Sequence, residues 1–173
     1  MGVLILLSTY NVADFLAEQI ASIRAQTYPD WRLLARDDGS DDDTPDLLRR
    51  LAQQDQRIRL VQDDLGNLGP AGGFARLMAL ALSEPEAAIA FADQDDVWHP
   101  DKLARQLEAL GGQAPDTPVL VHSDLALVDD RGQAQGATFR QRQHLRQAQS
   151  APLRTLLVQN HVVGCSMLIN RPL

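Results

Sequence analysis

"AFADQDDVWHPDKL", residues 90–103, contains the end of an apolar run and three aspartates that follow it directly. The run over residues 87–92 is short and uncharged, which is typical of a β-strand buried on both faces of a sheet. A proline and an aspartate further on predict the start of a helix. Asp93, Asp95 and Asp96 therefore stand between a strand and a helix. Carboxylates this close resist ionising together unless a cation or hydrogen-bond donors offset their charge.

The same alternation of strand and helix runs along most of the chain. Buried strands are predicted at residues 3–8, 31–36, 57–62, 87–92 and 118–122. Amphipathic helices are predicted at 14–26 with Asp14 as the cap, from Thr44 onward, at 74–82 and from Pro100 onward. Weaker patterns predict a hairpin from 125–128 and 133–139, a helix at 153–159 and a strand at 162–169. Right-handed crossovers between such strands predict an α/β, Rossmann-like, mainly parallel sheet with helices on both faces.

Composition narrows the classes of function. The 173 residues are 45% apolar and 23% charged, as expected for a single globular domain over residues 1–173. The net charge of −7 argues against nucleic acid as a partner. No run of the sequence is long enough to span a bilayer, and the first residues do not form a secretory signal, so we expect a cytoplasmic protein. Cys165 is the one cysteine, which excludes an internal disulfide and a thiolate zinc site and predicts a small core residue.

A polar segment follows each predicted strand. These segments are 8–11, 37–38, 63–64, 93–96 and Asp124. The carboxyl ends of parallel strands meet at one edge of a sheet, and ligands bind there. Solvated loop aspartates would instead be scattered over both edges. The sequence therefore predicts a ligand site at the carboxyl edge.

The pair Asp93 and Asp95 permits two chemical interpretations. The carboxylates can hold Mg²⁺ or Mn²⁺, hard cations that take oxygen ligands and share them with a substrate diphosphate. Alternatively, Asp93 is the nucleophile of a haloacid-dehalogenase-like phosphatase, whose Asp-x-Asp-x-(Thr/Val) pattern "DQDDV" fits. In a purely structural interpretation, Asp96 or Asp101 caps the next helix. The chain contains no dinucleotide fingerprint, P-loop or EF-hand, so neighbouring segments must decide.

Six segments follow one another along the chain: "ILLSTYN", "LLARDDGSDDDT", "GNLGPAGGF", "FADQDDVWHPDKL", "LVHSDLALVD" and "VQNHVVGCSMLINR". In this order they closely resemble the family 2 inverting glycosyltransferases, which have a GT-A fold, and in particular the bacterial rhamnosyltransferase-like branch. The resemblance covers essentially the whole chain. The combination of segments is highly specific, although no single one would be. In the phosphatases the Asp-x-Asp strand is normally the first of the core, whereas here it is the fourth.

The resemblance implies a site for a nucleotide-sugar donor. Thr9 and Tyr10 in "STYN" would line the nucleoside pocket, with Tyr10 against the pyrimidine. Asp38 in "DDGS" would accept a hydrogen bond from the N3–H of uracil or thymine, a hydrogen that cytosine lacks. Asn67 would approach the nucleotide sugar from the glycine-rich loop.

The resemblance places the family's metal motif on Asp93 and Asp95. Both carboxylates would contact Mg²⁺ or Mn²⁺ and the donor diphosphate, with Asp95 as the direct ligand. One departure is that Gly72 and Gly73 stand where relatives often carry a basic residue followed by asparagine. A side-chain contact to the sugar or the phosphate is therefore expected to be missing.

The base that deprotonates the acceptor is the residue the sequence does not identify. In the resembling family this carboxylate typically lies downstream of the "GCSMLINR" segment, and the sequence ends at Leu173. We therefore expect the C-terminal part of the domain and its base to lie beyond this chain, with Asp124 as the alternative base. The absence of that C-terminal part would leave apolar surface near residues 162–173 uncovered and favour self-association into a homo-oligomer.

The resemblance thus implies metal-dependent, inverting transfer of a sugar from dTDP-rhamnose or a UDP-sugar to a cell-surface glycan. Where the acceptor is lipid-linked, contact with the inner face of the membrane would be peripheral. Two other classes stay open. One is the phosphatase that uses Asp93, and the other is a non-catalytic fragment that binds a nucleotide sugar.

Overall fold

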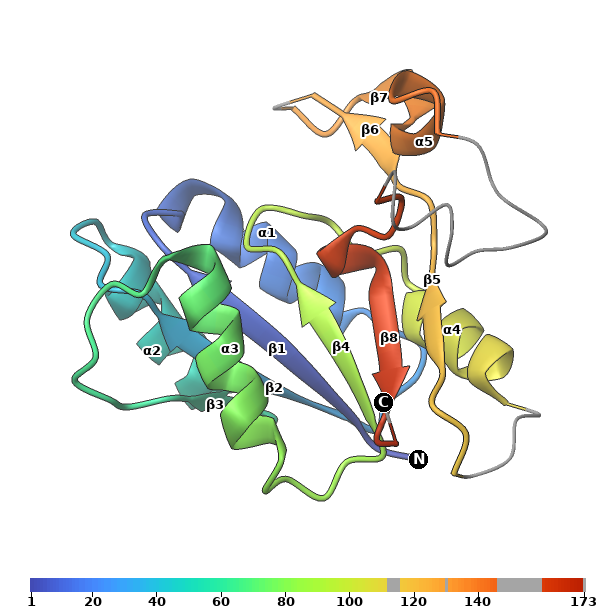
Figure 1. Ribbon diagram of the computed structural model, residues 1–173. Coiled ribbons are helices and arrows are strands. Elements are labelled where there is room, and N and C mark those ends of the chain that lie inside the picture. Colours follow the sequence, from blue (N-terminus) through green and yellow to red (C-terminus); the bar gives the residue numbers. More distant parts are fainter. Residues whose placement is uncertain (112–115, 130, 146–159, 173) are drawn as a thin grey trace.

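The fold was analysed in a computed structural model, which describes residues 1–111, 116–129, 131–145 and 160–172. The central sheet has the strand order β3-β2-β1-β4-β8-β5 (Figure 1). Its strands are β1 (Val3–Thr9), β2 (Trp31–Asp37), β3 (Ile58–Leu60), β4 (Ala88–Ala92), β5 (Leu120–His122) and β8 (Met167–Asn170). Strands β1 to β4 are parallel, and β8 is antiparallel to both β4 and β5. Strand β5 therefore runs in the direction of β4, and the predicted α/β, mainly parallel sheet is confirmed.

Helices cover both faces of the sheet, as predicted. The helices are α1 (Ala13–Arg24), α2 (Thr44–Gln54), α3 (Gly69–Ala81) and α4 (Lys102–Leu110). Helices α1, α2 and α4 pack on the face that receives Val3, Ile5 and Leu7. Helix α3 packs on the other face, against Leu4 and Leu6 (Figure 1). Both faces of β1 are thus buried, which is why its sequence is a continuous aliphatic run.

The start of α1 differs from the prediction. Asp14 is not the cap, because the helix begins at Ala13 and Val12 holds the N-cap position without a side-chain hydrogen bond. The free N–H groups are bound by the loop after β2. Val12 N–H donates to Thr44 Oγ1 at 2.9 Å, and Ala13 N–H donates to Asp42 Oδ2 at 3.2 Å. The cap therefore comes from a distant part of the chain, beyond the reach of a local pattern.

Helix α3 begins five residues before the predicted start. The glycine-rich segment "GPAGG" precedes the predicted helix, but Gly69 to Gly73 form its first turns. A proline in the first turn is compatible with a helix because the missing N–H has no partner there anyway. Gly69 N–H donates to Asp38 Oδ2 at 2.8 Å, so a side chain from the end of β2 stabilises this start.

The C-terminal half confirms one weak prediction and corrects another. The hairpin is formed by β6 (Ala126–Val128) and β7 (Ala134–Thr138), followed by the short helix α5 (Phe139–Arg142). The strand predicted at 162–169 is wrong in its first half. A 3₁₀ turn, η1 (Gly164–Ser166), precedes β8 there. The helix predicted at 153–159 lies outside the described residues. Among the described residues, no helix is long and apolar enough to span a membrane.

Candidate functional site

The predicted carboxyl edge is formed by the ends of β1, β2, β4 and β5. Because β8 is antiparallel, its start lies at the same edge, together with the turn η1 before it (Figure 1). Segments that are far apart in the sequence therefore meet at this edge. They form two groups of polar side chains, one after β2 and one after β4.

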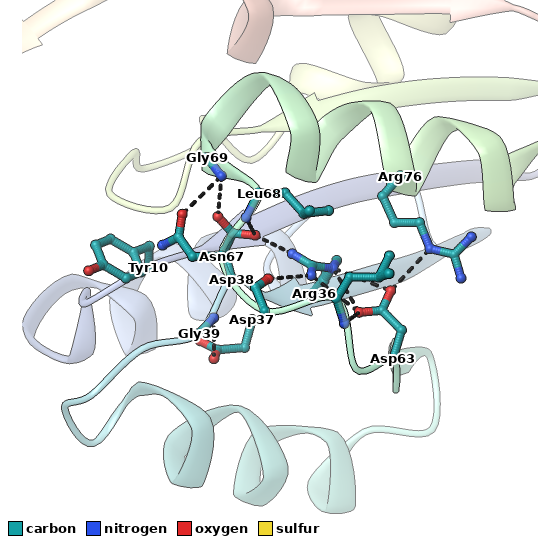
Figure 2. A network of polar contacts seen from close by, with 12 residues as sticks. Tyr10, Arg36, Asp37, Asp38, Gly39, Asp63, Asn67, Leu68, Gly69 and Arg76 are labelled. Atoms are coloured by element: carbon teal, nitrogen blue, oxygen red, sulfur yellow. Dashed lines mark hydrogen bonds and ion pairs between the residues drawn. The ribbon is translucent and has the colours of Figure 1, made fainter.

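The group after β2 is built around Arg36, whose side chain is only 2% exposed (Figure 2). Its guanidinium is paired with Asp38 and, at 3.2 Å, with Asp63, and it donates to the Gly66 carbonyl at 2.7 Å. Arg76 binds the other side of Asp63 at 3.0 Å. A buried charge is tolerated only when it is paired and hydrogen-bonded, which this network achieves.

Asp38 connects this network to the glycine-rich loop. Its Oδ1 accepts from Leu68 N–H at 2.9 Å, and its Oδ2 accepts from Gly69 N–H at 2.8 Å (Figure 2). The residue is 3% exposed. The carboxylate predicted to recognise a pyrimidine thus also stabilises the start of α3. A nucleotide base would have to bind it next to the N–H groups of Leu68 and Gly69. Its role in reading the base stays a prediction.

The other residues predicted to contact the nucleotide sugar lie at the same edge, but they differ in how exposed they are. Thr9 is fully buried, and its hydroxyl donates to the Arg36 carbonyl at 3.4 Å, joining β1 to β2. Tyr10 is 47% exposed, and its N–H donates to Gln94 Oε1 at 2.7 Å. Asn67 is exposed, and its Oδ1 accepts from Gly69 N–H at 3.0 Å. Of the three, Tyr10 and Asn67 are accessible to a nucleotide.

The group after β4 includes two residues beyond the predicted pair of Asp93 and Asp95. Ligand atoms of Asp93, Asp96 and Cys165 all lie within 4.8 Å of one another, whereas Asp95 is exposed and outside this cluster. Burial, and next the neighbouring Asp96, raise the pKa of Asp93. Burial and a hydrogen bond to Asp96 raise the pKa of the Cys165 thiol, which therefore stays protonated. The prediction of a buried cysteine is confirmed.

Lys102 was not singled out from the sequence, yet it supplies the cation beneath this cluster. Its Nζ donates to the Cys165 carbonyl at 2.6 Å and lies 3.6 Å from the centre of the Trp98 ring. Burial lowers the pKa of Lys102 to about 8, although Asp96 and Asp93 act in the opposite direction. The signal was present in the same segment, since Lys102 opens α4 six residues after Asp96.

The carboxylate groups after β4 suit a hard divalent cation. Asp93 and Asp96 supply partly buried carboxylates, and Asp95 is the carboxylate open to an incoming ligand. Oxygen ligands of this type suit Mg²⁺ and Mn²⁺, and the added charge would favour the ionised form of Asp93. The protonated thiol of Cys165 does not suit a soft metal.

Asp124, the alternative base, lies past the end of β5. Its Oδ1 accepts from the N–H groups of Leu125 at 2.9 Å and Arg140 at 3.1 Å. Burial acts to raise the pKa of Asp124, but hydrogen bonds from Thr138 and the Arg140 N–H outweigh it and hold the pKa below its usual value. A lower pKa weakens a general base. The observed contacts fit a structural role in the hairpin, and the assignment as base stays a prediction.

The glycines that depart from the family pattern have close neighbours. A Cβ at Gly73 would lie 2.4 Å from Ser8 Oγ, and one at Gly72 would lie 2.8 Å from Leu68 Cβ. Side chains at either position would require these neighbours to move. Gly73 thus allows α3 to pack closely on β1, and the expected loss of a side-chain contact to the donor stays a prediction.

Comparison with known proteins identifies the fold and the family. The structure resembles that of TarS from S. aureus in complex with UDP-GlcNAc, with a TM-score of 0.62 and 21% identity over 76% of this chain and 36% of that one. This likeness supports the GT-A fold. The family described as "Glycosyl transferase family 2" matches residues 4–170. The chain belongs to glycosyl transferase family 2.

Two curated relatives illustrate the family. An uncharacterized glycosyltransferase of Nostoc sp. is 34% identical over 80% of this chain and 41% of its own length. The UDP-Glc:alpha-D-GlcNAc-diphosphoundecaprenol beta-1,3-glucosyltransferase WfgD of Escherichia coli is 36% identical over 61% of this chain and 40% of its own length. The chain spans about two fifths of the length of the curated relatives it matches. Membership of this family does not support the phosphatase alternative for Asp93.

Proposed function

We propose that this chain binds a nucleotide-sugar donor and takes part in metal-dependent, inverting transfer of the sugar to a cell-surface glycan. The observation that carries the proposal is the exposed carboxylate of Asp95 beside the partly buried pair Asp93 and Asp96 at the end of β4. In a family 2 chain, this is where a cation and a donor diphosphate would share ligands.

The donor is proposed to be a UDP-sugar or dTDP-rhamnose, the second matching the rhamnosyltransferase-like branch. One 36% identical relative is named for the use of UDP-Glc. Tyr10 is 47% exposed, so its ring is free to pack on the pyrimidine, and Asn67 is exposed on the neighbouring loop. Asp38 would select uracil or thymine through N3–H, adding one bond to those it already accepts.

The acceptor is proposed to be a growing glycan, since the same relative is named for a lipid-linked sugar diphosphate.

In the reaction, the acceptor oxygen bonds to the anomeric carbon while the bond from that carbon to the diphosphate oxygen breaks. The bonding electrons leave with the nucleoside diphosphate, and the hydroxyl proton passes to a base. A bound divalent cation would supply charge neutralisation for the departing diphosphate. Asp93 and Asp95 would hold that cation at the diphosphate end of the donor. The reaction is proposed to occur in the cytoplasm, with peripheral contact to the membrane.

The test is calorimetric titration of UDP and dTDP in Mn²⁺ or in EDTA. Binding is expected to be clearly tighter with the metal, and Asp95→Asn should remove most of the difference. The matched control is Asp116→Asn, an exposed carboxylate before β5, which should bind as the parent does. Equal affinity with and without metal in the parent protein would refute the assignment of Asp95.

A transfer assay separates donor binding from turnover. Released nucleoside diphosphate and inorganic phosphate are measured separately with UDP-glucose and dTDP-rhamnose. A glycosyltransferase releases the diphosphate from these donors, whereas a phosphatase releases inorganic phosphate from a phosphomonoester, for which p-nitrophenyl phosphate is the probe. Binding without either product supports the non-catalytic alternative.

A further inference from the structure

Helix α1 and the turn that follows it carry a stripe of polar side chains that is buried in the core. Gln19 and Ser22 lie in the helix, and Gln26 lies two residues beyond its end. The three are 0%, 8% and 7% exposed, whereas the other buried residues of the helix are aliphatic. Burying an amide or a hydroxyl costs free energy unless the group is hydrogen-bonded, and an aliphatic residue would avoid that cost. The polar stripe therefore needs partners inside the protein.

Gln19 and Ser22 bind the two ends of the loop over residues 93–98, here called the cation loop. Gln19 Nε2 donates to the Asp93 carbonyl at 2.8 Å, and Ser22 Oγ accepts the Trp98 N–H at 2.9 Å. The Ser22 hydroxyl also lies 2.7 Å from the Gln19 carbonyl and 3.2 Å from Gln19 Oε1, so the two side chains support each other. Together they fix the first and the last residue of the cation loop from a helix that is 74 and 76 positions away in the sequence.

Gln26 binds a different part of the chain. Its Nε2 donates to the His99 carbonyl at 2.8 Å, and its Oε1 accepts the Leu103 N–H at 3.0 Å. Both partners lie beyond the cation loop, before and within the first turn of α4. Gln26 is therefore a buried, hydrogen-bonded glutamine like Gln19 that does not bind the cation loop, and it offers a matched control.

The cation loop holds like charges close together. Ligand atoms of Asp93 and Asp96 lie within 4.8 Å of each other. Two carboxylates at this separation repel each other, and the repulsion would spread a loop that was not held. Because the Asp93 carbonyl and the Trp98 N–H are fixed, the loop also has fewer conformations to lose when an ion binds.

We propose that Gln19 and Ser22 are positioning residues, which hold the backbone of the cation loop so that its carboxylates are arranged for Mg²⁺ or Mn²⁺ before the ion binds. They act through the backbone of the loop and not through contact with the ion. The inference rests on the proposed function, since it explains how the same site is prearranged. It also explains why polar side chains occupy buried positions of α1 that aliphatic residues could fill.

The test is a titration of the protein with Mn²⁺ alone, in which the free ion is followed by electron paramagnetic resonance. Gln19→Met keeps the length of the side chain but removes the donor to the Asp93 carbonyl, and it should weaken Mn²⁺ binding about tenfold. Ser22→Ala is a smaller change at the other end of the loop and should weaken binding about threefold, so it serves if the first variant folds poorly. Gln26→Met also removes hydrogen bonds of a buried amide, and it should bind Mn²⁺ as the parent does.

Hydrogen exchange of the metal-free protein gives a second readout that does not depend on ion binding. The amides of residues 93–98 should exchange faster in Gln19→Met and Ser22→Ala than in the parent and in Gln26→Met. The inference is overturned if Gln19→Met keeps the Mn²⁺ affinity of the parent, if Gln26→Met loses as much affinity, or if exchange in the cation loop is unchanged. Absence of Mn²⁺ binding by the parent would instead refute the metal dependence of the proposed function, and the exchange experiment would still test the positioning of the loop.

Discussion

The guanidinium of Arg36 and the carboxylate of Asp38 form an ion pair whose side chains are only 2% and 4% exposed. The two residues are separated by one position at the end of β2, yet their contacts extend to the loop and helix that follow β3. Asp38 binds the N–H groups of Leu68 and Gly69, and Arg36 binds the Gly66 carbonyl. The pair therefore sets the position of the glycine-rich loop at the candidate donor site.

Removing the charge of Asp38 should destabilise the fold. Asp38→Asn leaves Arg36 with Asp63 as its one remaining carboxylate partner, and breaking a buried pair costs about 3–5 kcal/mol. We expect a loss near 3 kcal/mol in urea unfolding, because Asp63 still neutralises part of the charge. The control is Asp46→Asn, which breaks the exposed pair with Arg49 and should leave the unfolding midpoint unchanged. Equal effects of the two variants would contradict a structural role for the buried pair.

The same residue offers a test of base selection. If Asp38 reads the pyrimidine, Asp38→Ala should weaken UDP binding by roughly ten- to a hundredfold and narrow the preference for UDP over CDP. If it acts only through the loop, the variant should weaken UDP and CDP equally. Calorimetric titration of both nucleotides under conditions where the variant is folded distinguishes the two outcomes.

The start of α1 should depend on a residue from the next helix. Thr44 is fully buried, and its hydroxyl accepts the Val12 N–H at 2.9 Å. Thr44→Val keeps the shape but leaves that N–H unpaired, which should cost about 1–3 kcal/mol in thermal or urea unfolding. Thr27→Val, at an exposed position, is the matched control. Wild-type stability of Thr44→Val would show that another acceptor, such as water, serves as the cap.

Stability should fall in acid through Glu86. A hydrogen bond from Arg32 lowers the pKa of Glu86 in the folded protein. A carboxyl whose pKa is lower in the folded state stabilises the fold above its unfolded value of about 4.3, and this contribution is lost as the pH falls through the folded pKa. Glu86→Gln should therefore reduce Tm at pH 7 and flatten the decline of Tm below about pH 5. Glu108→Gln, an exposed glutamate on α4, should follow the parent curve.

The architecture was largely predictable because it depends on patterns that are local in the sequence. Buried faces were predicted from the aliphatic run of β1 and from the apolar stripes of α1, α2 and α4. The alternation of strands and helices predicted a parallel sheet. The positions of the aspartates at strand ends predicted that these side chains gather at one edge of the sheet, where the candidate site lies. The family followed from the order of six short segments, and the match over residues 4–170 confirms it.

Only the tertiary structure decided which polar groups meet. Thr44 caps α1 across 32 positions, Lys102 reaches the carbonyl of Cys165 across 63, and His122 lies beside His161. Such pairs leave no periodicity in the sequence, because each depends on how distant loops converge at one edge. The same reason explains why ligand atoms of Asp93 and Asp96 lie within 4.8 Å of the Cys165 thiol. The sequence by itself determined the strands, the edge and the kinds of residue at the site, whereas folding decided which of those residues are buried as supports and which remain open to a ligand.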